Sequence, residues 1–488
     1  MILRVVLQLA YFILLIPLAL YALTIGYLIF LYVRRPPRPI PPPAVTDWPL
    51  VAVQVPLYNE PAVAERVIRA VAALDYPRTC LHIQILDDST DDTPTLLAPL
   101  VAELRAAGFR IDHIRRASRD GYKAGALSNG LKLTEAEYIA IFDADFVPPP
   151  HFLRYTVPHL LADPGLGLVQ ARWSHLNAET NLITRVQALI LDGHFAIEQA
   201  TRAANGLLMT FNGTGGVWRR ACIQDAGGWQ SDTLAEDADL SLRAQFLGWR
   251  CAFLSHCTVP GELPPQIASL KSQQARWARG TTGVLLKLHR RLWQAPIPRR
   301  ARIMAFFGLL GYPLQSLSLA LLVLQPILIL SGAYEGLKAL PLALFGVIGM
   351  AIPILYVIGQ GVLYPDWMRR TFALPALLLF GVGLAVANSR AVLATLQGRK
   401  GDWQPTPKFK IEGQAHQRQY VALPPPADPN LPYEVAFGLY ALVGGVIAAY
   451  RAPSLMLYFA VYALGFFVTA LWGGLDRWRS RIAQQELS

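Results

Sequence analysis

The chain has little charge and little cysteine for its length. Of its 488 residues only 16% are charged, whereas 53% are hydrophobic, and the mean hydropathy is +0.33. This composition is unlike that of a fully soluble protein, so we expect much of the surface to face lipid. The four cysteines show no Cys-x-x-Cys spacing; they are Cys80, Cys222, Cys251 and Cys257. We therefore expect free thiols, and neither a disulfide framework nor a zinc site.

Acidic residues are also scarce, because 33 Asp and Glu stand against 44 Lys and Arg, a net charge of +11. Such an excess could indicate nucleic-acid binding, but many of the basic residues flank apolar segments. Examples are Arg34-Arg35, Arg299-Arg300, Arg369-Arg370 and Arg477. This pattern is typical of positive-inside topology and of contact with anionic lipid headgroups. We expect a lipid bilayer as partner, and no nucleic acid.

Long apolar runs occupy both ends of the chain. Residues 5 to 33 are long enough to span a bilayer and too long for a signal-peptide core, so residues 1–34 predict a transmembrane helix. The basic, proline-rich stretch from Arg34 to Pro43 cannot continue a helix and marks the cytoplasmic exit. The N-terminus is then outside.

The second half predicts membrane regions at 300–398 and 430–476. Spans are expected at about 303–332, 339–363, 433–450 and 453–475. The run 372–387 contains Pro375 and is short, so an interfacial or re-entrant helix is expected there. With five spans in all, the basic loop 399–420 and the C-terminus stay cytoplasmic. The protein is predicted to be a multi-pass protein of the plasma (inner) membrane.

Between these ends, residues 48–290 alternate short apolar runs with amphipathic stretches, as an α/β domain does. Strands are expected at 50–56, 82–86, 138–142 and 167–169, and the first three end in polar or acidic residues. Ligands of an open parallel sheet bind at the carboxyl ends of its strands, so these groups should converge on one nucleotide-binding crevice. Interfacial helices are expected where this domain ends.

A series of short motifs follows these strands in order. The motifs are Tyr58-Asn59-Glu60, Asp87-Asp88, Lys123-Ala124-Gly125, Asp143-x-Asp145, Phe211-Asn212-Gly213-Thr214, Glu236-Asp237 and Gln273-x-x-Arg276-Trp277. Taken singly they are weak, because acidic residues also end strands or begin helices, and a tryptophan can simply anchor an interfacial helix. As a set, they resemble the membrane-embedded family 2 glycosyltransferases, which include cellulose, chitin and hyaluronan synthases. Longer strings such as Gly121-Tyr122-Lys123-Ala124-Gly125-Ala126-Leu127 look most like the plant mannan and glucomannan synthases and their glucan-making relatives.

The resemblance implies a fold and a set of roles. The fold is a GT-A-type, mostly parallel cytosolic domain inserted between transmembrane helices. The nucleotide would contact Tyr58, Glu60, Asp87, Asp88, Lys123 and Arg276. The diphosphate would carry Mg²⁺ or Mn²⁺ held by Asp143 and Asp145, and Asp237 would be the general base. The acceptor would contact Gln273, Trp277 and the turn Phe211-Asn212-Gly213-Thr214.

A further match lies in the loop 399–420. Trp403-Gln404-Pro405-Thr406-Pro407-Lys408 resembles the gating loop of the synthases, with Trp in place of Phe and Pro in place of Val. Trp403, Thr406 and Lys408 are the residues expected to act there. The alternative is a basic juxtamembrane loop that binds lipid headgroups.

Three functions remain open on this basis. The leading one is an inverting, metal-dependent hexosyltransferase that adds sugar from UDP-glucose or GDP-mannose to a growing β-linked polysaccharide, with a β-1,4 bond as the family expectation, and passes it through the membrane. The second transfers a single sugar to a lipid such as diacylglycerol, ceramide or a polyprenyl phosphate. The third is a transporter or channel whose soluble domain only binds nucleotide, although binding alone has no need of a base at Asp237. The residues that would choose between uracil and guanine are not legible in the sequence.

Overall fold

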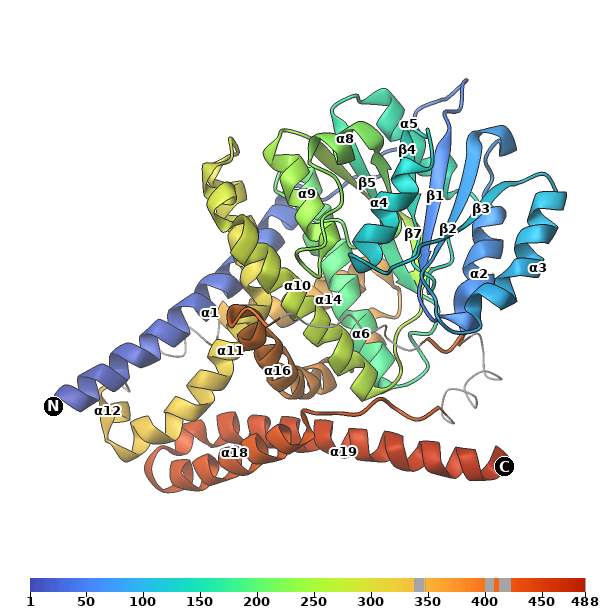
Figure 1. Ribbon diagram of the computed structural model, residues 1–488. Coiled ribbons are helices and arrows are strands. Elements are labelled where there is room, and N and C mark those ends of the chain that lie inside the picture. Colours follow the sequence, from blue (N-terminus) through green and yellow to red (C-terminus); the bar gives the residue numbers. More distant parts are fainter. Residues whose placement is uncertain (338–345, 347, 400–407, 412–422, 488) are drawn as a thin grey trace.

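A seven-stranded sheet forms the centre of the computed structural model, which describes residues 1–337, 346, 348–399, 408–411 and 423–487 (Figure 1). The strands are β1 (Val51–Leu57), β2 (Leu81–Asp87), β3 (Arg110–Arg115), β4 (Tyr138–Ile141), β5 (Leu166–His175), β6 (Gly216–Arg219) and β7 (Arg250–Gly261). Their order is β3-β2-β1-β4-β6-β5-β7, and β6 runs antiparallel to both of its neighbours while the other pairs are parallel. The predicted mostly parallel α/β fold is confirmed.

Both faces of the sheet are buried, and the alternation of side chains along each strand explains how. In β1, Val51, Val53 and Val55 face one core, whereas Ala52 faces the other. The first core is closed by α2 (Pro61–Ala72), α3 (Thr93–Ala106) and α5 (Phe152–Ala162). The second is closed by α4 (Tyr122–Lys132), α8 (Arg220–Asp225) and α9 (Glu236–Phe246).

A long amphipathic helix, α10 (Ile267–Gln294), joins the sheet domain to the apolar helices. It packs against α9 on one side and against α11 (Arg299–Leu330) and α16 (Leu374–Leu396) on the other (Figure 1). The remaining helices of the sheet domain are η1 (Arg78–Cys80), α6 (Leu182–Gly193), the π-helix η2 (His194–Gln199) and α7 (Ala200–Ala204). An amphipathic helix thus stands at the end of the domain, and its location at a membrane interface stays a prediction.

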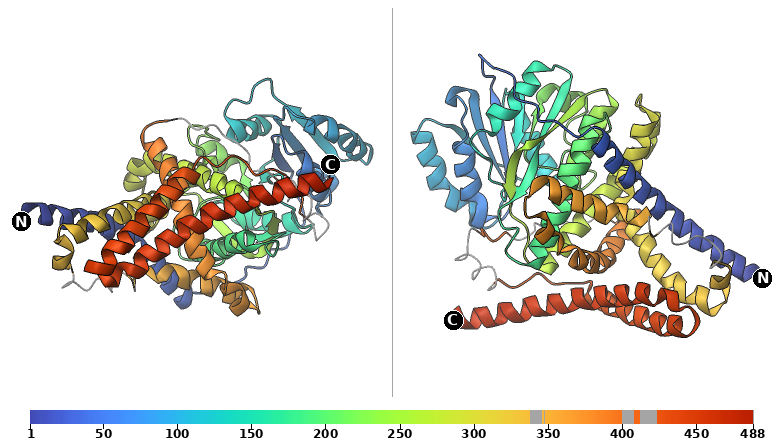
Figure 2. Two further views of the ribbon diagram at one scale, coloured as in Figure 1. Left: turned by 90° about the horizontal axis from the view of Figure 1, so that it is seen from below. Right: turned by 180° about the vertical axis from the view of Figure 1, so that it is seen from behind.

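Five helical segments are long and apolar enough to cross a membrane, judged by length and composition among the described residues. They are α1 (Ile2–Arg34), α11, α15 (Trp367–Thr371) with α16, α18 (Leu431–Arg451), and η3 (Pro453–Leu455) with α19 (Met456–Leu487). Figure 2 shows α18 and α19 side by side, with their connection at the same end of the molecule as the N-terminus. The shorter helices of this part are α12 (Ala333–Leu337) and α14 (Ala351–Leu363).

The number of candidate spans matches the expectation, but one member of the set differs. The expected interfacial helix at 372–387 continues to Leu396, because Asn388 and Ser389 are buried in it and the Asn388 amide donates to Gln315 Oε1 at 2.7 Å. The candidate spans thus include 367–396, where the sequence favoured an interfacial or re-entrant helix. Of the expected span 339–363, residues 351–363 form the short helix α14, and residues 338–345 and 347 lie outside the described part.

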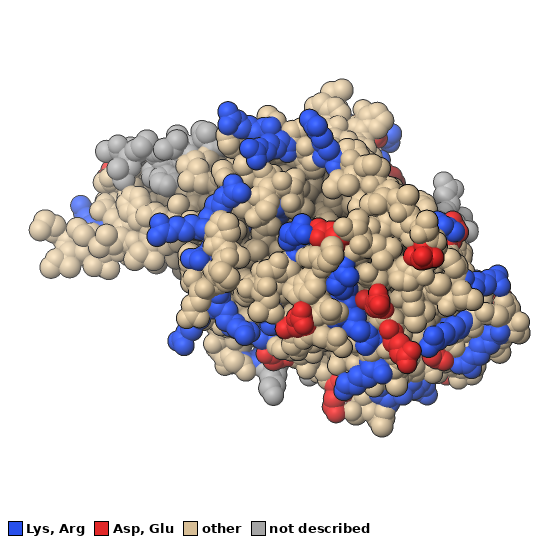
Figure 3. All heavy atoms as spheres, turned by 90° about the horizontal axis from the view of Figure 1, so that it is seen from above, with Lys and Arg blue, Asp and Glu red and all other residues tan. Residues whose placement is uncertain are grey.

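Charge is distributed unevenly over the surface. On the face drawn in Figure 3, acidic and basic side chains mix over the right-hand part, whereas basic ones predominate toward the side where α1 and α11 extend. Exposed arginines near the ends of α1 and α10 and at the start of α11 include Arg34, Arg35, Arg290, Arg291 and Arg299. This distribution is what flanking residues of membrane helices produce.

Candidate active site

The polar groups that follow the parallel strands meet at one edge of the sheet. Asp88 N–H donates to Leu57 O at 3.0 Å, and Thr90 N–H donates to Asn59 Oδ1 at 2.8 Å, so the ends of β1 and β2 are tied together. Asp143 and Asp145 follow β4, the next strand of the sheet. The predicted convergence of the strand ends is therefore present.

The two aspartates at the end of β2 have different environments. Asp87 is 1% exposed, and its carboxylate accepts from His113 Nε2 at 2.8 Å and from Ser89 N–H at 2.9 Å. Asp88 forms a two-pronged pair with Arg116, whose Nε lies 2.9 Å from Asp88 Oδ1. The Asp87 side chain is enclosed and positions the turn, and the expected contacts of Asp87 and Asp88 with a nucleotide stay a prediction.

Lys123 gathers three separate segments around its ammonium group. Its Nζ lies 2.5 Å from Asp143 Oδ1, 2.9 Å from Gly213 O and 3.9 Å from Glu236 Oε1. Burial opposes the charged form, but Asp143 and Glu236 outweigh it and raise the pKa of Lys123. The ammonium therefore stays charged and fixes the end of β4, the turn at Gly213 and the start of α9 relative to one another.

Asp237 lies in the first turn of α9 beside this cluster. Its Oδ1 accepts from Ala238 N–H at 2.7 Å, and a Cβ added to Gly213 would lie 3.0 Å from its Oδ2. Gly213 also has φ +86°, so glycine is needed both for the turn and for this close approach. Burial and the neighbouring Glu236 raise the pKa of Asp237, against the opposing effect of Lys123. A carboxylate with a raised pKa is suited to accept a proton near neutral pH.

The turn 211–214 is held by its own side chains and by side chains from other segments. Phe211 is 1% exposed and packs against Trp218, with ring centroids 5.7 Å apart. The Thr214 hydroxyl accepts from Asp143 N–H at 2.9 Å, and Asn212 Oδ1 accepts from Gln199 Nε2 at 2.7 Å. Phe211 and Thr214 are buried and shape the turn, and the expected contact of this turn with an acceptor stays a prediction. Asn212, half-buried, stays a candidate.

The residues Gln273, Arg276 and Trp277 lie half-buried on α10. Burial lowers the pKa of Arg276, while Asp143 and Asp145 act in the opposite direction, so this guanidinium faces the carboxylate cluster. Farther along α10, a Cβ added to Gly280 would lie 2.8 Å from Ala235 Cβ. Gly280 lies about one helical turn after Trp277. Its contact with Ala235 therefore packs α10 directly against the residue that precedes Glu236-Asp237.

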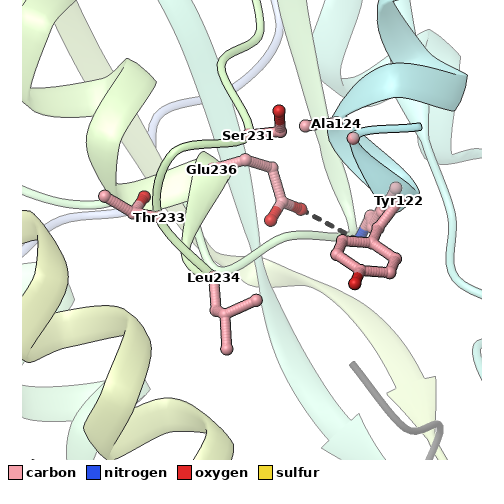
Figure 4. A pocket seen from close by; sticks show the side chains of 8 residues that line it. Tyr122, Ala124, Ser231, Thr233, Leu234 and Glu236 are labelled. Carbon is pink, nitrogen blue, oxygen red and sulfur yellow. Dashed lines mark ion pairs between the residues drawn. The ribbon is translucent and has the colours of Figure 1, made fainter. Parts of the chain in front are cut away.

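A shallow pocket opens to the surface beside Lys123. It is lined by Gly121, Tyr122, Lys123, Ala124, Ser231, Thr233, Leu234 and Glu236. In Figure 4 the Glu236 carboxylate points across it toward Lys123, with the ion pair drawn as a dashed line. The start of α4 and the loop before α9 therefore face each other across a polar gap.

The end of the expected gating loop reaches the same cluster. Lys408 pairs with Asp145, and the next residue, Phe409, donates its N–H to Glu262 Oε1 at 2.7 Å. Trp403 and Thr406 lie outside the described residues. The position of Lys408 agrees with a loop that approaches a bound nucleotide, and gating itself stays a prediction.

The comparison with known families bears directly on this site. The family model "Glycosyltransferase like family 2" matches residues 49–280, a segment that holds all seven strands and the motifs from Tyr58 to Trp277. The chain carries a family 2 glycosyltransferase domain. The apolar helices α1 and α11 to α19 lie outside the matched residues.

Individual relatives agree with this assignment. The domain is 44% identical over 246 residues to the probable glucomannan 4-beta-mannosyltransferase 7 of Oryza sativa subsp. japonica, a match covering 50% of this chain and 42% of that protein. It is 42% identical over 247 residues to glucomannan 4-beta-mannosyltransferase 2 of Arabidopsis thaliana, covering 50% and 46%. Either match thus spans less than half of the relative's length.

A solved structure shares the fold. The mannosyltransferase PcManGT of Pyrobaculum calidifontis, solved in complex with GDP-Man and Mn²⁺, superposes with a TM-score of 0.52 at 21% identity. The match covers 81% of this chain and 99% of that one. It supports the GT-A-like arrangement of the glycosyltransferase domain.

The carboxylates of the domain fit a divalent cation. Asp143 and Asp145 supply hard oxygen ligands, and each already holds a lysine ammonium, so the site is built to accept positive charge. In the described ranges, no three His, Cys, Asp or Glu side chains come together as a metal site. Two carboxylates are what a cation needs when phosphate oxygens and water complete its shell.

Sequence reasoning missed three residues of the glycosyltransferase domain. They are Arg116, paired with Asp88; Arg119, whose Cζ lies 3.2 Å from the ring centroid of Tyr58; and Glu262, which holds Phe409 N–H and Arg66. Glu262 follows β7, so the rule that ligands gather at the ends of strands would have indicated it if β7 had been predicted. Arg116 and Arg119 precede the motif Lys123-Ala124-Gly125, but they belong to no recognisable sequence pattern themselves.

Proposed function

We propose that the protein transfers mannose from GDP-mannose to a growing β-1,4-linked mannan or glucomannan. The observation that carries this proposal is the identity of 42–44% to glucomannan 4-beta-mannosyltransferases across the whole domain in which Lys123, Asp143 and Asp237 come together. UDP-glucose, the other donor considered from the sequence, has less support from these relatives.

The reaction would proceed by a single displacement. An acceptor hydroxyl forms a bond to the anomeric carbon while the bond from that carbon to the diphosphate oxygen breaks, and the configuration is inverted. The hydroxyl proton passes to Asp237, whose raised pKa and position beside the Gly213 turn suit it to this task. The electron pair of the broken bond leaves with the nucleoside diphosphate.

The departing diphosphate is stabilised by positive charge that the fold already holds in place. Lys123 and Arg276 provide fixed cations on one side of the carboxylates Asp143 and Asp145. Mg²⁺ or Mn²⁺ bound by these carboxylates would neutralise the phosphate oxygens. Lys408 would add a contact from the loop once the nucleotide is in place.

The acceptor would lie between the turn at Asn212 and Trp277, whose flat apolar ring offers a surface for a sugar ring. Because α10 packs directly on α11 and α16, a lengthening chain would pass from Trp277 into the membrane helices. In this arrangement the glycosyltransferase domain and the C-terminus are cytoplasmic, the N-terminus is outside, and the protein resides in the plasma (inner) membrane.

The test is a radiolabel assay with purified protein in lipid, offering GDP-mannose and UDP-glucose separately with Mg²⁺ or Mn²⁺. Alcohol-insoluble polymer that a β-mannanase digests is the expected product of GDP-mannose. Label found only in the organic phase would contradict the polymer proposal and establish a single-sugar transfer to lipid. Polymer made only from UDP-glucose, and digested by a β-glucanase, would contradict the proposed donor.

A further inference from the structure

The loop 230–235 leads into α9 and so to the proposed base at Asp237. Throughout this segment the backbone is neither helix nor strand, and Ser231 and Asp232 are exposed. On one side the loop faces α4 across the pocket beside Lys123, where a Cβ added to Gly121 would lie 3.1 Å from Ser231 Oγ (Figure 4). A loop without its own regular structure takes its position from the elements that pack on it.

The helix α10 packs on the other side of this loop. Gly280, Gly283 and Lys287 are three and four residues apart, so they share one face of the helix. Gly280 contacts Ala235, and a Cβ added to Gly283 would lie 3.6 Å from Thr233 Cβ. The two glycines thus allow a close approach of α10 to the loop, and Lys287 lies one turn farther along the same face.

Lys287 connects the chain on both sides of Asp237. Its Nζ lies 2.7 Å from Gln230 Oε1, 2.6 Å from Asp232 Oδ1 and 2.9 Å from Asp239 Oδ1. Gln230 and Asp232 belong to the loop, whereas Asp239 lies in the first turn of α9 and is 0% exposed. One ammonium group on α10 therefore holds the segment that carries Asp237 from before and from behind.

The body of α9 has supports of its own. Arg243 Nε donates to Asp239 Oδ2 at 2.8 Å, and the Ser241 hydroxyl donates to Asp237 O at 2.5 Å. The same Ser241 hydroxyl accepts from Phe211 N–H at 2.7 Å, which ties α9 to the turn 211–214. Without Lys287 the helix should therefore stay in place, while the loop before it and the Asp237 side chain lose their attachment to α10.

We propose that Lys287 is a positioning residue that places the Asp237 carboxylate for proton transfer, an inference that rests on the proposed transferase function. A base must lie within hydrogen-bond distance of the hydroxyl that it deprotonates, and a displacement of about 1 Å can cost about 10²-fold in rate. The helix α10 also carries Trp277, the proposed surface for the acceptor sugar. Lys287 thus fixes the base to the same helix that would hold the acceptor.

The experiment measures the release of nucleoside diphosphate from GDP-mannose and from UDP-glucose by the full-length protein in lipid nanodiscs with Mn²⁺, beside titrations of GDP. For Lys287→Met we expect kcat to fall about tenfold to 10²-fold, with the KM for the donor and the GDP affinity within about threefold. Lys287→Arg keeps the charge and several donors and should retain kcat within about threefold. Arg290→Met, at an exposed arginine of the same helix, is the matched control and should act as the unaltered protein does.

A second comparison separates positioning from a general loss of structure. In an Asp237→Asn background, Lys287→Met should lower the residual rate less than about twofold, because the group that Lys287 positions has already lost its function. A further loss of about tenfold in the double variant would overturn the inference, since Lys287 would then act independently of Asp237.

Three other results of the single variants would overturn it as well: an unchanged kcat in Lys287→Met, a loss of GDP affinity in that variant, or an Arg variant as impaired as the Met variant. Because either donor is accepted in the assay and only nucleotide release is followed, these results do not depend on which sugar or product the protein uses. An unaltered protein that releases no nucleoside diphosphate from either donor would contradict the proposed function itself, on which this inference rests.

Discussion

The proposed active site has two halves, one for the donor and one for the acceptor, and they are built from different kinds of groups. The donor half lies at the strand ends and is a network of charges, with Lys123 on Asp143, Lys408 on Asp145 and Arg116 on Asp88. The proposed acceptor half is supported by α10, which packs on candidate membrane helices, and includes half-buried groups such as Trp277 and Asn212. The positions of the charged donor-side groups therefore depend on the sheet. The position of the acceptor would depend on how α10 lies between the sheet and the apolar helices.

Asp237→Asn should have the largest effect, because it removes the base that connects the two halves. We expect transfer to fall about 10²- to 10⁴-fold. Initial rates of label incorporation from GDP-mannose measure this. Asp225→Asn, an exposed carboxylate at the end of α8, should leave the rate unchanged. A rate in the Asp237 variant within threefold of the unaltered protein would contradict the assignment of the base.

Lys123→Met should follow, since it leaves Asp143 and Glu236 without their shared cation. Removing one preorganised electrostatic group from an active site costs about 10²- to 10³-fold in rate, and we expect the lower end of this range together with weaker nucleotide binding. Lys132→Met, an exposed lysine at the end of the same helix α4, is the control. Loss of transfer without loss of nucleotide affinity would remove Lys123 from the donor half.

Trp277→Ala tests the acceptor half alone. The stacking surface for a sugar ring is lost, so we expect polymer formation to fall about tenfold, roughly the loss of one aromatic contact, while GDP binding is kept. Trp293→Ala, at an exposed tryptophan of the same helix, should have no such effect. A matching loss of GDP affinity in the Trp277 variant would show that the two halves are not separable in this way.

Gly213→Ala should give a smaller loss, because it introduces a Cβ 3.0 Å from Asp237 Oδ2 at a residue with φ +86°. We expect about a fivefold to tenfold lower rate, from a strain of about 1 kcal/mol and a displaced base. Gly206→Ala has a comparable positive φ of +61° but no atom near its added Cβ, so it measures the backbone strain alone. Equal losses in both variants would show that contact with Asp237 is unimportant.

The pH dependence should be the mildest effect. Burial and Glu236 raise the pKa of Asp237, and a base acts in its deprotonated form, so activity is full above this raised pKa and declines as the pH falls through it. The acidic limb of the rate profile should therefore lie above the range of an ordinary carboxyl group. An acidic limb near pH 4 would contradict the environment assigned to Asp237.

The sequence predicted the parts of the fold that follow simple periodicity. β1, β2 and β4 are buried on both faces and read as apolar runs, so their ends and the acidic groups after them were placed correctly. The strand β3 was missed because it lies at the edge of the sheet and alternates exposed Arg110 and Asp112 with Ile111. The strand β6 was also not predicted, because it has only four residues and runs antiparallel to its neighbours.

Other features depend on contacts between distant segments, which a linear pattern does not contain. The helix α16 keeps Asn388 buried beyond the apolar run 372–387 because the Asn388 amide donates to Gln315 on α11. Phe211 and Asp87 belong to matched motifs, yet the fold buries both, and matching a motif does not tell a contact residue from a supporting one. Arg119 belongs to no sequence motif, and only its contact with the Tyr58 ring in the structure makes it a candidate.

The most direct test of the division into two halves is a titration of GDP-mannose into the Asp237→Asn protein with Mn²⁺, beside the same titration of Asp143→Asn. We predict that the Asp237 variant binds the donor with an affinity within about threefold of the unaltered protein while its polymer formation falls about 10²- to 10⁴-fold, and that the Asp143 variant loses both donor binding and polymer formation. Donor binding lost in the Asp237 variant, or kept in the Asp143 variant, would contradict it.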